Sequence, residues 1–237
     1  MSGHSKWANI KRKKEANDKV KGNVFSKMSR LITLAVVEGG GITEPDNNVK
    51  LRLAIEKAHA VNMPKENIKR AIERGVGPDK NQIKEIVYEG FGPYGVNLMI
   101  LGTTDNPNRT LSEIRNILEK YQGKLGGLGS VSYQFRKCGL ITFSKSIINQ
   151  NKILEISDRL NAFDLNEDDQ KYYVYFPYED LGHIKSKLQD TKYDSAEVDF
   201  KPQTIMPFED DEKLKKISEL IDLLEASDDI QKVFTNL

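Results

Sequence analysis

Residues 86–121 read IVYEGFGPYGVNLMILGTTDNPNRTLSEIRNILEKY, and they contain the alternation of elements that decides the fold. Two apolar runs, 86–88 and 96–101, are typical of strands, and the glycine- and proline-rich stretch between them is typical of a turn. A helix is expected to begin at about Thr110, which has the form of a capping box with Glu113. The segment therefore predicts a strand–turn–strand–helix unit of the α+β class.

Three short amphipathic helices are expected upstream of this unit, because apolar residues recur there at helical spacing. The first helix carries Phe25 on its apolar face, and the other two run from about residue 49 to 61 and from Pro64 onward. The residues expected to begin or end them are Asp46, Asn47 or Asn48 before the second helix, Gly39–Gly41 after the first, and Gly75 and Gly77 after the third. Short connections between three such helices predict a small helical bundle.

The alternation of strands and helices repeats downstream of residue 121. Expected strands lie near residues 131–135, 140–143, 172–176, 196–200, 204–206 and 230–234, with helices near 153–160, 177–188 and 209–226. The acid pairs Asp210-Asp211 and Asp228-Asp229 are expected to place negative charge at helix starts. This pattern predicts two small α+β units after the helical bundle.

The charge of the chain is distributed unevenly. The 237 residues have a formal net charge of +1, but residues 1–80 hold 17 Lys and Arg against nine Asp and Glu, which is a net charge of +8. The remaining residues therefore carry a net charge of −7. Such asymmetry predicts that one end of the chain meets a polyanion.

The first 30 residues form a basic arm with nine cations against Glu15 and Asp18. Neutralising the phosphates of a nucleic acid releases counterions, so a lysine cluster gives salt-sensitive affinity. The alternative is a solvated face that only aids solubility. Trp7 could stack on a base or dock on the helical bundle. The arm residues predicted to bind nucleic acid are Lys6, Trp7, Lys11, Arg12, Lys13, Lys14, Lys19, Lys21, Lys27 and Arg30.

Further cations extend the predicted interface onto the second and third helices. They are Arg52, Lys65, Lys69, Arg70 and Arg74, together with Lys57. Arg70 and Arg74 lie one turn apart and share a helix face. The alternative is a partly neutralised surface, in which these cations pair with the glutamates at 56, 66 and 73.

Two loops resemble ligand-binding loops but have structural explanations. The residue types of 105–110 suit a turn and a helix start, and Arg109 is the one side chain that the turn does not require. We therefore expect Arg109 to contact nucleic acid. The glycine-rich loop 123–129 lacks the Gly-Lys-Ser/Thr ending of a Walker motif, so close packing is favoured over phosphate binding.

Several functional classes are not supported by the sequence. No apolar run approaches the roughly 20 residues of a membrane span, and the N-terminus has no apolar signal-peptide core. Cys138 is the single cysteine and the three histidines are scattered, so neither a disulfide nor a zinc site is expected. No catalytic constellation is visible. We expect a cytoplasmic protein that is not an enzyme, with no cofactor, no metal and no small-molecule substrate.

Short motifs along the whole chain resemble those of the YebC/PmpR family. They are Gly3-His-Ser-Lys-Trp-Ala-Asn-Ile-Lys-Arg-Lys-Lys14, Leu51-Arg-Leu-Ala-Ile-Glu-Lys-Ala58, Asn62-Met-Pro-Lys65, Ile68-Lys-Arg-Ala-Ile72, Tyr88-Glu-Gly-Phe-Gly-Pro93, Asp105-Asn-Pro-Asn-Arg-Thr110, Gly126-Gly-Leu-Gly-Ser-Val131, Ser195-Ala-Glu-Val198, Pro202-Gln-Thr204 and Asp229-Ile-Gln-Lys-Val-Phe-Thr-Asn236. They occur in the order that the family shows, so the resemblance is specific.

The resemblance implies both a fold and a function. It implies an α+β protein with an N-terminal three-helix bundle and two small, ferredoxin-like α+β domains, the last inserted within the middle one. The expected domains are residues 1–80, residues 81–138 with 203–237, and the inserted residues 139–202. It also implies a DNA-binding transcriptional regulator. The alternative is a ribosome-associated translational activator that binds ribosomal RNA, with ribosomal proteins as further partners, and that assists elongation at difficult stretches such as proline runs.

Overall fold

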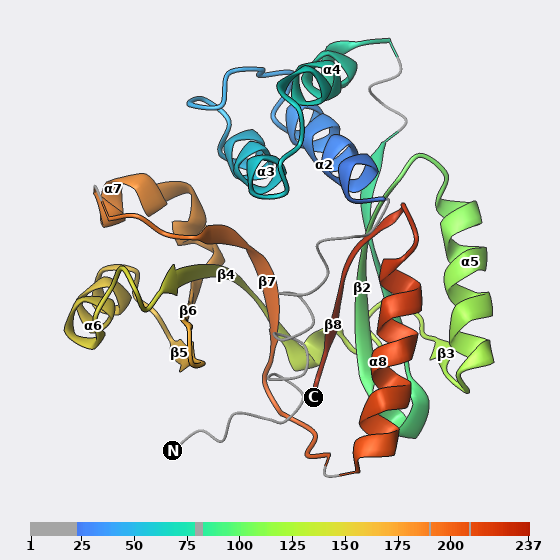
Figure 1. Cartoon of the computed structure of the whole chain (residues 1–237). Helices are drawn as coiled ribbons and strands as arrows, with labels where there is room; N and C mark the ends of the chain where they lie inside the picture. The colour runs from blue at the N-terminus through green and yellow to red at the C-terminus, as the bar shows by residue number, and fades with distance from the viewer. Residues whose placement is uncertain (1–22, 79–82, 190, 209) are drawn as a thin grey trace. The chain divides into compact units, whose positions relative to one another are not determined.

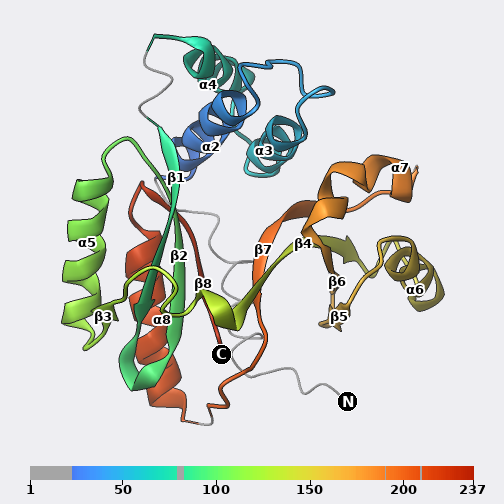
Figure 2. The ribbon, with the colours of Figure 1, turned by 180° about the vertical axis from the view of Figure 1, so that it is seen from behind.

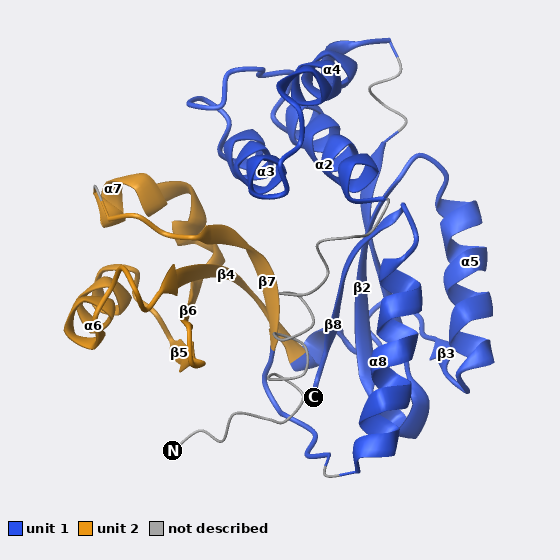
Figure 3. Cartoon of the chain, in the orientation of Figure 1, with its two compact units in different colours: residues 1, 3–134, 202–237 blue, residues 2, 135–201 orange. Residues whose placement is uncertain are grey.

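The computed structural model describes residues 23–78, 83–189, 191–208 and 210–237. These residues divide into two compact units (Figure 3), one containing the described residues from 23 to 134 together with those from 202 to 237, and the other containing the described residues from 135 to 201. The first unit contains N-terminal helices and an antiparallel sheet, and the second is built around another sheet. The predicted α+β class, with helices followed by two small α+β parts, is confirmed.

The N-terminal helices of the first unit are α2 (Val24–Glu38), α3 (Val49–Ala60) and α4 (Lys65–Val76). They enclose a small apolar core that includes Ile32, Leu51 and Ala71. Of the three candidate caps for α3, Asn48 is the one used, because its side chain accepts a hydrogen bond from the Leu51 N–H at 3.1 Å. The amide of Asn48 also donates to the Ala35 carbonyl at 2.9 Å, so this cap fastens α3 to α2.

The packing of α2 against α4 depends on Gly75. We expected Gly75 to end the third helix, and that expectation is wrong: Gly75 is buried inside α4, which continues to Val76 before Gly77 caps it. A Cβ at position 75 would lie 2.6 Å from the Cβ of Val36. The Thr33 hydroxyl also donates to the Ala71 carbonyl at 2.9 Å across the same contact. Glycine is therefore needed here because the two helices approach closely.

Replacing Gly75 with Ala is expected to lower the free energy of unfolding by about 2 kcal/mol, because the added methyl overpacks the α2–α4 contact. The usual gain of about 1 kcal/mol for alanine over glycine in a helix is not enough to offset this. Gly77→Ala is the matched control, since a Cβ there meets nothing closer than the Arg74 carbonyl at 3.4 Å. Thermal unfolding of both variants checks the expectation, and a Gly75→Ala protein as stable as the control would contradict it.

The sheet of the first unit has the strand order β3-β1-β2-β8. Its strands are β1 (Lys84–Phe91), β2 (Asn97–Thr104), β3 (Lys124–Leu125) and β8 (Ile230–Thr235), and each neighbouring pair is antiparallel. Helices α5 (Pro107–Lys120) and α8 (Asp211–Glu225) share one apolar core with the sheet. Figure 2 shows the long β1–β2 hairpin beside these two helices. The C-terminal strand β8 therefore completes a sheet whose first strand begins 146 residues earlier in the chain.

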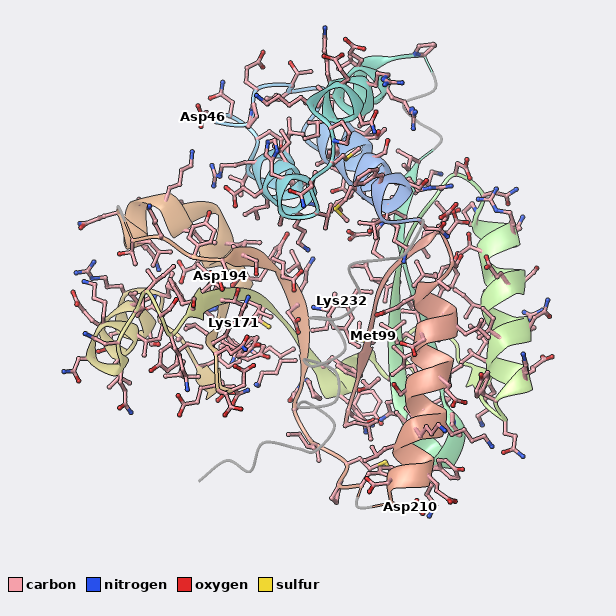
Figure 4. The ribbon with its side chains drawn as sticks, viewed as in Figure 1. Asp46, Met99, Lys171, Asp194, Asp210 and Lys232 are labelled. Atoms are coloured by element: carbon pink, nitrogen blue, oxygen red, sulfur yellow. The ribbon has the colours of Figure 1, made fainter. Side chains whose placement is uncertain are left out.

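Three local expectations for this unit are corrected. Helix α5 begins at Pro107, with Asn106 as its cap, and not at Thr110, which lies inside the first turns. The expected strand at 204–206 is absent from the described residues of that segment. Asp210, labelled in Figure 4, does cap α8 by accepting from the backbone N–H groups of Glu212 and Lys213, but Asp229 follows that helix and precedes β8.

The second unit has a four-stranded sheet in the order β5-β6-β4-β7. Its elements are β4 (Phe135–Ser144), α6 (Gln150–Arg159), β5 (Asp164–Glu167), β6 (Lys171–Pro177), α7 (Ile184–Leu188) and β7 (Ser195–Pro202), the last ending at the boundary with the first unit. Figure 1 labels these elements, and the fully buried Phe143 and Phe176 lie on β4 and β6. At its rim, Lys171 and Asp194 form an ion pair at 3.0 Å. No helix in the described part of the chain is long and apolar enough to cross a membrane.

Candidate nucleic-acid interface

The predicted interface divides into residues that the structure describes and residues that it does not. The arm residues Lys6, Trp7, Lys11, Arg12, Lys13, Lys14, Lys19 and Lys21 lie outside the described residues. The other predicted residues lie on α2, α3, α4 and α5. They include an exposed set around α4, a pair of arginines held by carboxylates, Lys27 on a backbone carbonyl, and the half-buried Arg52.

Arg70 and Arg74 of the exposed set border a hollow of about 580 Å³ between α2 and α4, which we call the α2/α4 groove. It is lined by Phe25, Ser26, Ser29, Arg30 and Thr33 of α2, by Asn67, Arg70 and Arg74 of α4, and by Met63, Ile83 and Asp105. All of these residues belong to the first unit. Arginines, hydroxyls, an amide and apolar side chains thus meet in one concave surface.

The positive charges of Arg70 and Arg74 are not neutralised by ion pairs with the described carboxylates. Arg70 donates from Nε to the Glu66 carbonyl at 3.3 Å and from Nη2 to the Asn67 side-chain oxygen at 3.1 Å, and both acceptors are neutral. Arg74 is exposed, and within the described residues its guanidinium has neither an ion-pair nor a hydrogen-bond partner. A charge that is only hydrogen-bonded to neutral groups remains available to a phosphate.

Three other predicted cations of α3 and α4 lie outside the α2/α4 groove. Lys65 and Lys69 are exposed, and the Lys69 amine lies 4.0 Å from the Glu73 carboxylate in a weak surface pair. Arg52 is half-buried on α3, and its buried Nε finds no acceptor among the described residues. None of these three lines the α2/α4 groove.

Arg30 and Arg109 are instead held by a buried carboxylate, Asp229, whose side chain is only 4% exposed. Its Oδ2 accepts hydrogen bonds from Arg109 Nη2 at 2.8 Å, Thr110 Oγ1 at 2.6 Å and Thr104 Oγ1 at 3.1 Å. Arg30 Nη1 lies 2.8 Å from Oδ1, as a charge contact rather than an aligned hydrogen bond. We call these five residues the Asp229 cluster.

The Asp229 cluster keeps its charges at neutral pH. Burial raises the pKa of Asp229, but hydrogen bonds from Thr110 and Arg109 and the charge of Arg30 outweigh it, so the net shift is downward. Hydrogen bonds to Asp229 and Asp105 raise the pKa of Arg109. The Arg109 side chain is 51% exposed, so one edge still faces solvent while the other holds two carboxylates.

The cluster also joins the helical bundle to the sheet of the first unit. Arg30 comes from α2, Thr104 from β2, Arg109 and Thr110 from α5, and Asp229 from the turn before β8. Nearby, the Lys27 amine donates to the carbonyl of Glu225, at the C-terminal end of α8 where the helix dipole favours a cation. Lys27 and Arg30 therefore have structural partners within the first unit.

The glycine-rich loop owes its shape to Glu89, a residue that the sequence did not single out. The Glu89 carboxylate accepts backbone N–H groups from Gly129 at 2.8 Å, Val131 at 2.7 Å and Ser132 at 2.9 Å. Burial raises the pKa of Glu89, but these backbone hydrogen bonds outweigh it and lower the pKa overall. The loop's N–H groups thus bind a carboxylate of the chain itself, in the manner in which such loops bind phosphate.

Among the described residues, no group of three or more His, Cys, Asp or Glu side chains is placed to hold a metal ion. Cys138 is buried, and burial raises the pKa of its thiol to about 12. The thiolate that nucleophilic chemistry requires is therefore suppressed at neutral pH.

Comparison with known proteins confirms the resemblance predicted from the sequence. Residues 5–78 match the TACO1/YebC protein N-terminal domain, and residues 83–237 match the TACO1/YebC second and third domain. A relative from Prosthecochloris aestuarii is 44% identical over 241 residues, which cover 100% of this chain and 95% of the relative. One from Syntrophomonas wolfei is 42% identical over 243 residues, with coverages of 100% and 96%.

Both relatives are named probable transcriptional regulatory protein. The crystal structure of a conserved hypothetical protein from Aquifex aeolicus has the same fold, with a TM-score of 0.81 at 37% identity. That match covers 91% of this chain and 89% of the Aquifex chain. The sequence motifs, the fold and these matches agree, and the chain belongs to the TACO1/YebC family.

Proposed function

We propose that this protein is a non-enzymatic regulator of gene expression that binds nucleic acid through its N-terminal helices and basic arm. The observation that carries the proposal is the α2/α4 groove, where Arg70 and Arg74 present charge that no described carboxylate neutralises. Seven of the arm's nine cations lie in the part of the sequence that directly precedes α2. The name of the relatives, probable transcriptional regulatory protein, supports a regulatory role.

The geometry suits contacts to phosphate. Asn67 and the Glu66 carbonyl orient the Arg70 guanidinium and leave further N–H groups free to donate to phosphate oxygens. Arg30, Lys27 and Arg109 contribute less to binding in this proposal, because their charges already face carboxylates or a carbonyl. The exposed cations Lys65 and Lys69 widen the positive surface and attract the polyanion at longer range.

DNA is the partner that the relatives' name favours. The second candidate is a translation factor that binds ribosomal RNA, and it is favoured by the charge distribution. The residues after position 80 carry a net charge of −7, which repels a long duplex but complements the basic proteins of a ribosome. Both candidates use the same cationic interface, so they differ in the target and not in the site.

An Arg70→Ala/Arg74→Ala variant is expected to bind its nucleic-acid target at least about tenfold more weakly, because two phosphate contacts are lost and the salt dependence falls by about two counterions. Arg115→Ala/Lys120→Ala is the matched control, since it removes two exposed cations from α5 and the same net charge. The control is expected to change affinity less than about twofold. Thermal unfolding of both variants should match the parent protein, because all four side chains are exposed.

The measurement is made with two targets at matched salt, a promoter-length duplex DNA and purified ribosomes in a sedimentation assay. Selective weakening on DNA supports the transcriptional role, and selective weakening on ribosomes supports the translational one. Equal behaviour of the two variants on both targets would show that only net charge matters, and would overturn the proposed interface.

A further inference from the structure

The α2/α4 groove has an apolar part that phosphate binding does not use. Phe25 was expected on the buried face of its helix, yet its side chain is 42% exposed and borders the groove. Met63, which is nearly buried, also lines the groove. An aromatic ring that lines the same hollow as two arginines offers an apolar contact that phosphate binding alone does not use.

We propose that the α2/α4 groove holds an unpaired nucleotide, with the base on the ring of Phe25 and the phosphate on Arg70 and Arg74. The inference rests on the proposed nucleic-acid function and adds to it the class of ligand: single-stranded segments rather than continuous duplex. The chemical groups of a nucleotide match the side chains that line the groove. Aromatic side chains stack on bases of any sequence, and arginine forks match phosphate oxygens.

The other side chains of the groove complete this correspondence. Ser26 and Ser29 lie on the same helix as Phe25, and their hydroxyls both donate and accept hydrogen bonds, as the edges of bases and the sugar hydroxyls require. Asn67 holds Arg70 from within the groove. The volume of about 580 Å³ lies in the ordinary range for sites that enclose small organic ligands.

The inference selects unpaired nucleotides for a geometric reason. In a duplex the bases are stacked inside the helix, and a concave surface meets only the phosphates and sugars. An aromatic ring within a hollow reaches a base only when that base is unstacked, as in a loop, a bulge or a single strand. Phe25 therefore contributes to binding of single strands, whereas Arg70 and Arg74 contribute to binding of both forms.

The test measures binding of the full chain to a fluorescent 12-nucleotide RNA of unstructured sequence and to the same sequence in a duplex, at matched salt. Phe25→Ala is expected to weaken single-strand binding about fivefold or more and to change duplex binding less than about twofold. Phe25→Trp is expected to keep the single-strand affinity of the parent protein, because it retains an aromatic ring. Phe25→Leu keeps apolar bulk but no ring, and it is expected to weaken single-strand binding as Phe25→Ala does. Val76→Ala is the control, because Val76 is an exposed apolar residue of α4 outside the groove.

A second readout locates the base directly. A 5-iodouridine in the single-stranded RNA is expected to crosslink on irradiation to the tryptic peptide Gly22–Lys27, which carries Phe25. Equal losses on both RNA forms, an unchanged affinity of Phe25→Ala, or crosslinks confined to other peptides would overturn the inference while leaving the proposed function intact. A parent protein that binds neither form nor any other nucleic acid would overturn both.

Discussion

Replacing Asp229 with Ala is expected to lower the free energy of unfolding by about 3 kcal/mol, because several donors lose a buried charged acceptor. The variant removes the buried carboxylate that faces Arg30 and Arg109 and that accepts from the Thr104 and Thr110 hydroxyls. Both arginines are partly exposed and keep Asp105 nearby, so most of the cost comes from the three donors that lose a buried charged acceptor, at about 1 kcal/mol each. Denaturant unfolding monitored by circular dichroism gives the value.

Asp228→Ala is the matched control for this substitution. Asp228 is the preceding residue and carries the same charge, but one of its carboxylate oxygens is buried without a hydrogen-bond partner among the described residues. Its replacement is therefore expected to change the free energy of unfolding by less than about 0.5 kcal/mol. Equal destabilisation by both variants would show that the Asp229 cluster does not hold the first unit together.

The same assay separates two roles of Arg109. If its contacts with Asp229 and Asp105 are its main contribution, Arg109→Ala lowers the free energy of unfolding, and it does so much less in an Asp229→Ala background. If the exposed edge of Arg109 also binds phosphate, the single variant additionally weakens nucleic-acid binding. The contact with Asp229 therefore determines how much of the positive charge of Arg109 remains available to a ligand.

The local elements of the fold could largely be predicted from the sequence, because helices and strands leave periodic patterns within a few residues. The errors occurred where a distant contact overrides the local pattern. Gly75 was expected to end a helix because glycine often does so. A side chain at this position would instead clash with Val36, which lies 39 residues earlier in the chain. Thr110 looked like a cap, but its hydroxyl is bonded to Asp229, which is 119 residues away.

The candidate site could be predicted only in part for the same reason. The cations of α4 stand out in the sequence by type and spacing, and the structure brings Arg70 and Arg74 together beside α2. Asp229 and Glu89 leave no such signal, because single acidic residues are common and their burial depends on partners far along the chain. Phe25 was placed on the buried face of the first helix because its spacing fits the apolar pattern. In the structure this end of α2 lies beyond the core of the bundle, so Phe25 is exposed.

Replacing Glu89 with Ala is the other substitution with a large expected effect, a loss of about 3 kcal/mol in the free energy of unfolding. Three backbone N–H groups, one in a buried hydrogen bond (Val131) and two in half-buried ones (Gly129 and Ser132), lose a charged acceptor, and each such hydrogen bond contributes about 1 kcal/mol or more. Glu89→Gln keeps one acceptor oxygen and is expected to lose about half as much. Glu119→Ala, which removes an exposed carboxylate from α5, is the control and is expected to be nearly neutral.

Hydrogen exchange and pH dependence distinguish this contribution from a general loss of stability. The amides of Gly129, Val131 and Ser132 are expected to exchange faster in Glu89→Ala than in Glu119→Ala, with the rest of the first unit less affected. Because the folded protein lowers the pKa of Glu89 below its ordinary value of 4.5, the stabilisation is fully present above that pH. It is lost as the pH falls through the lowered pKa, where protonation removes the charge that the N–H groups bind. The difference in stability between the parent protein and Glu89→Gln should therefore be constant near neutral pH and shrink in acid. A difference that stays constant down to the acid-unfolding limit would show that the Glu89 carboxylate does not hold the loop by its charge.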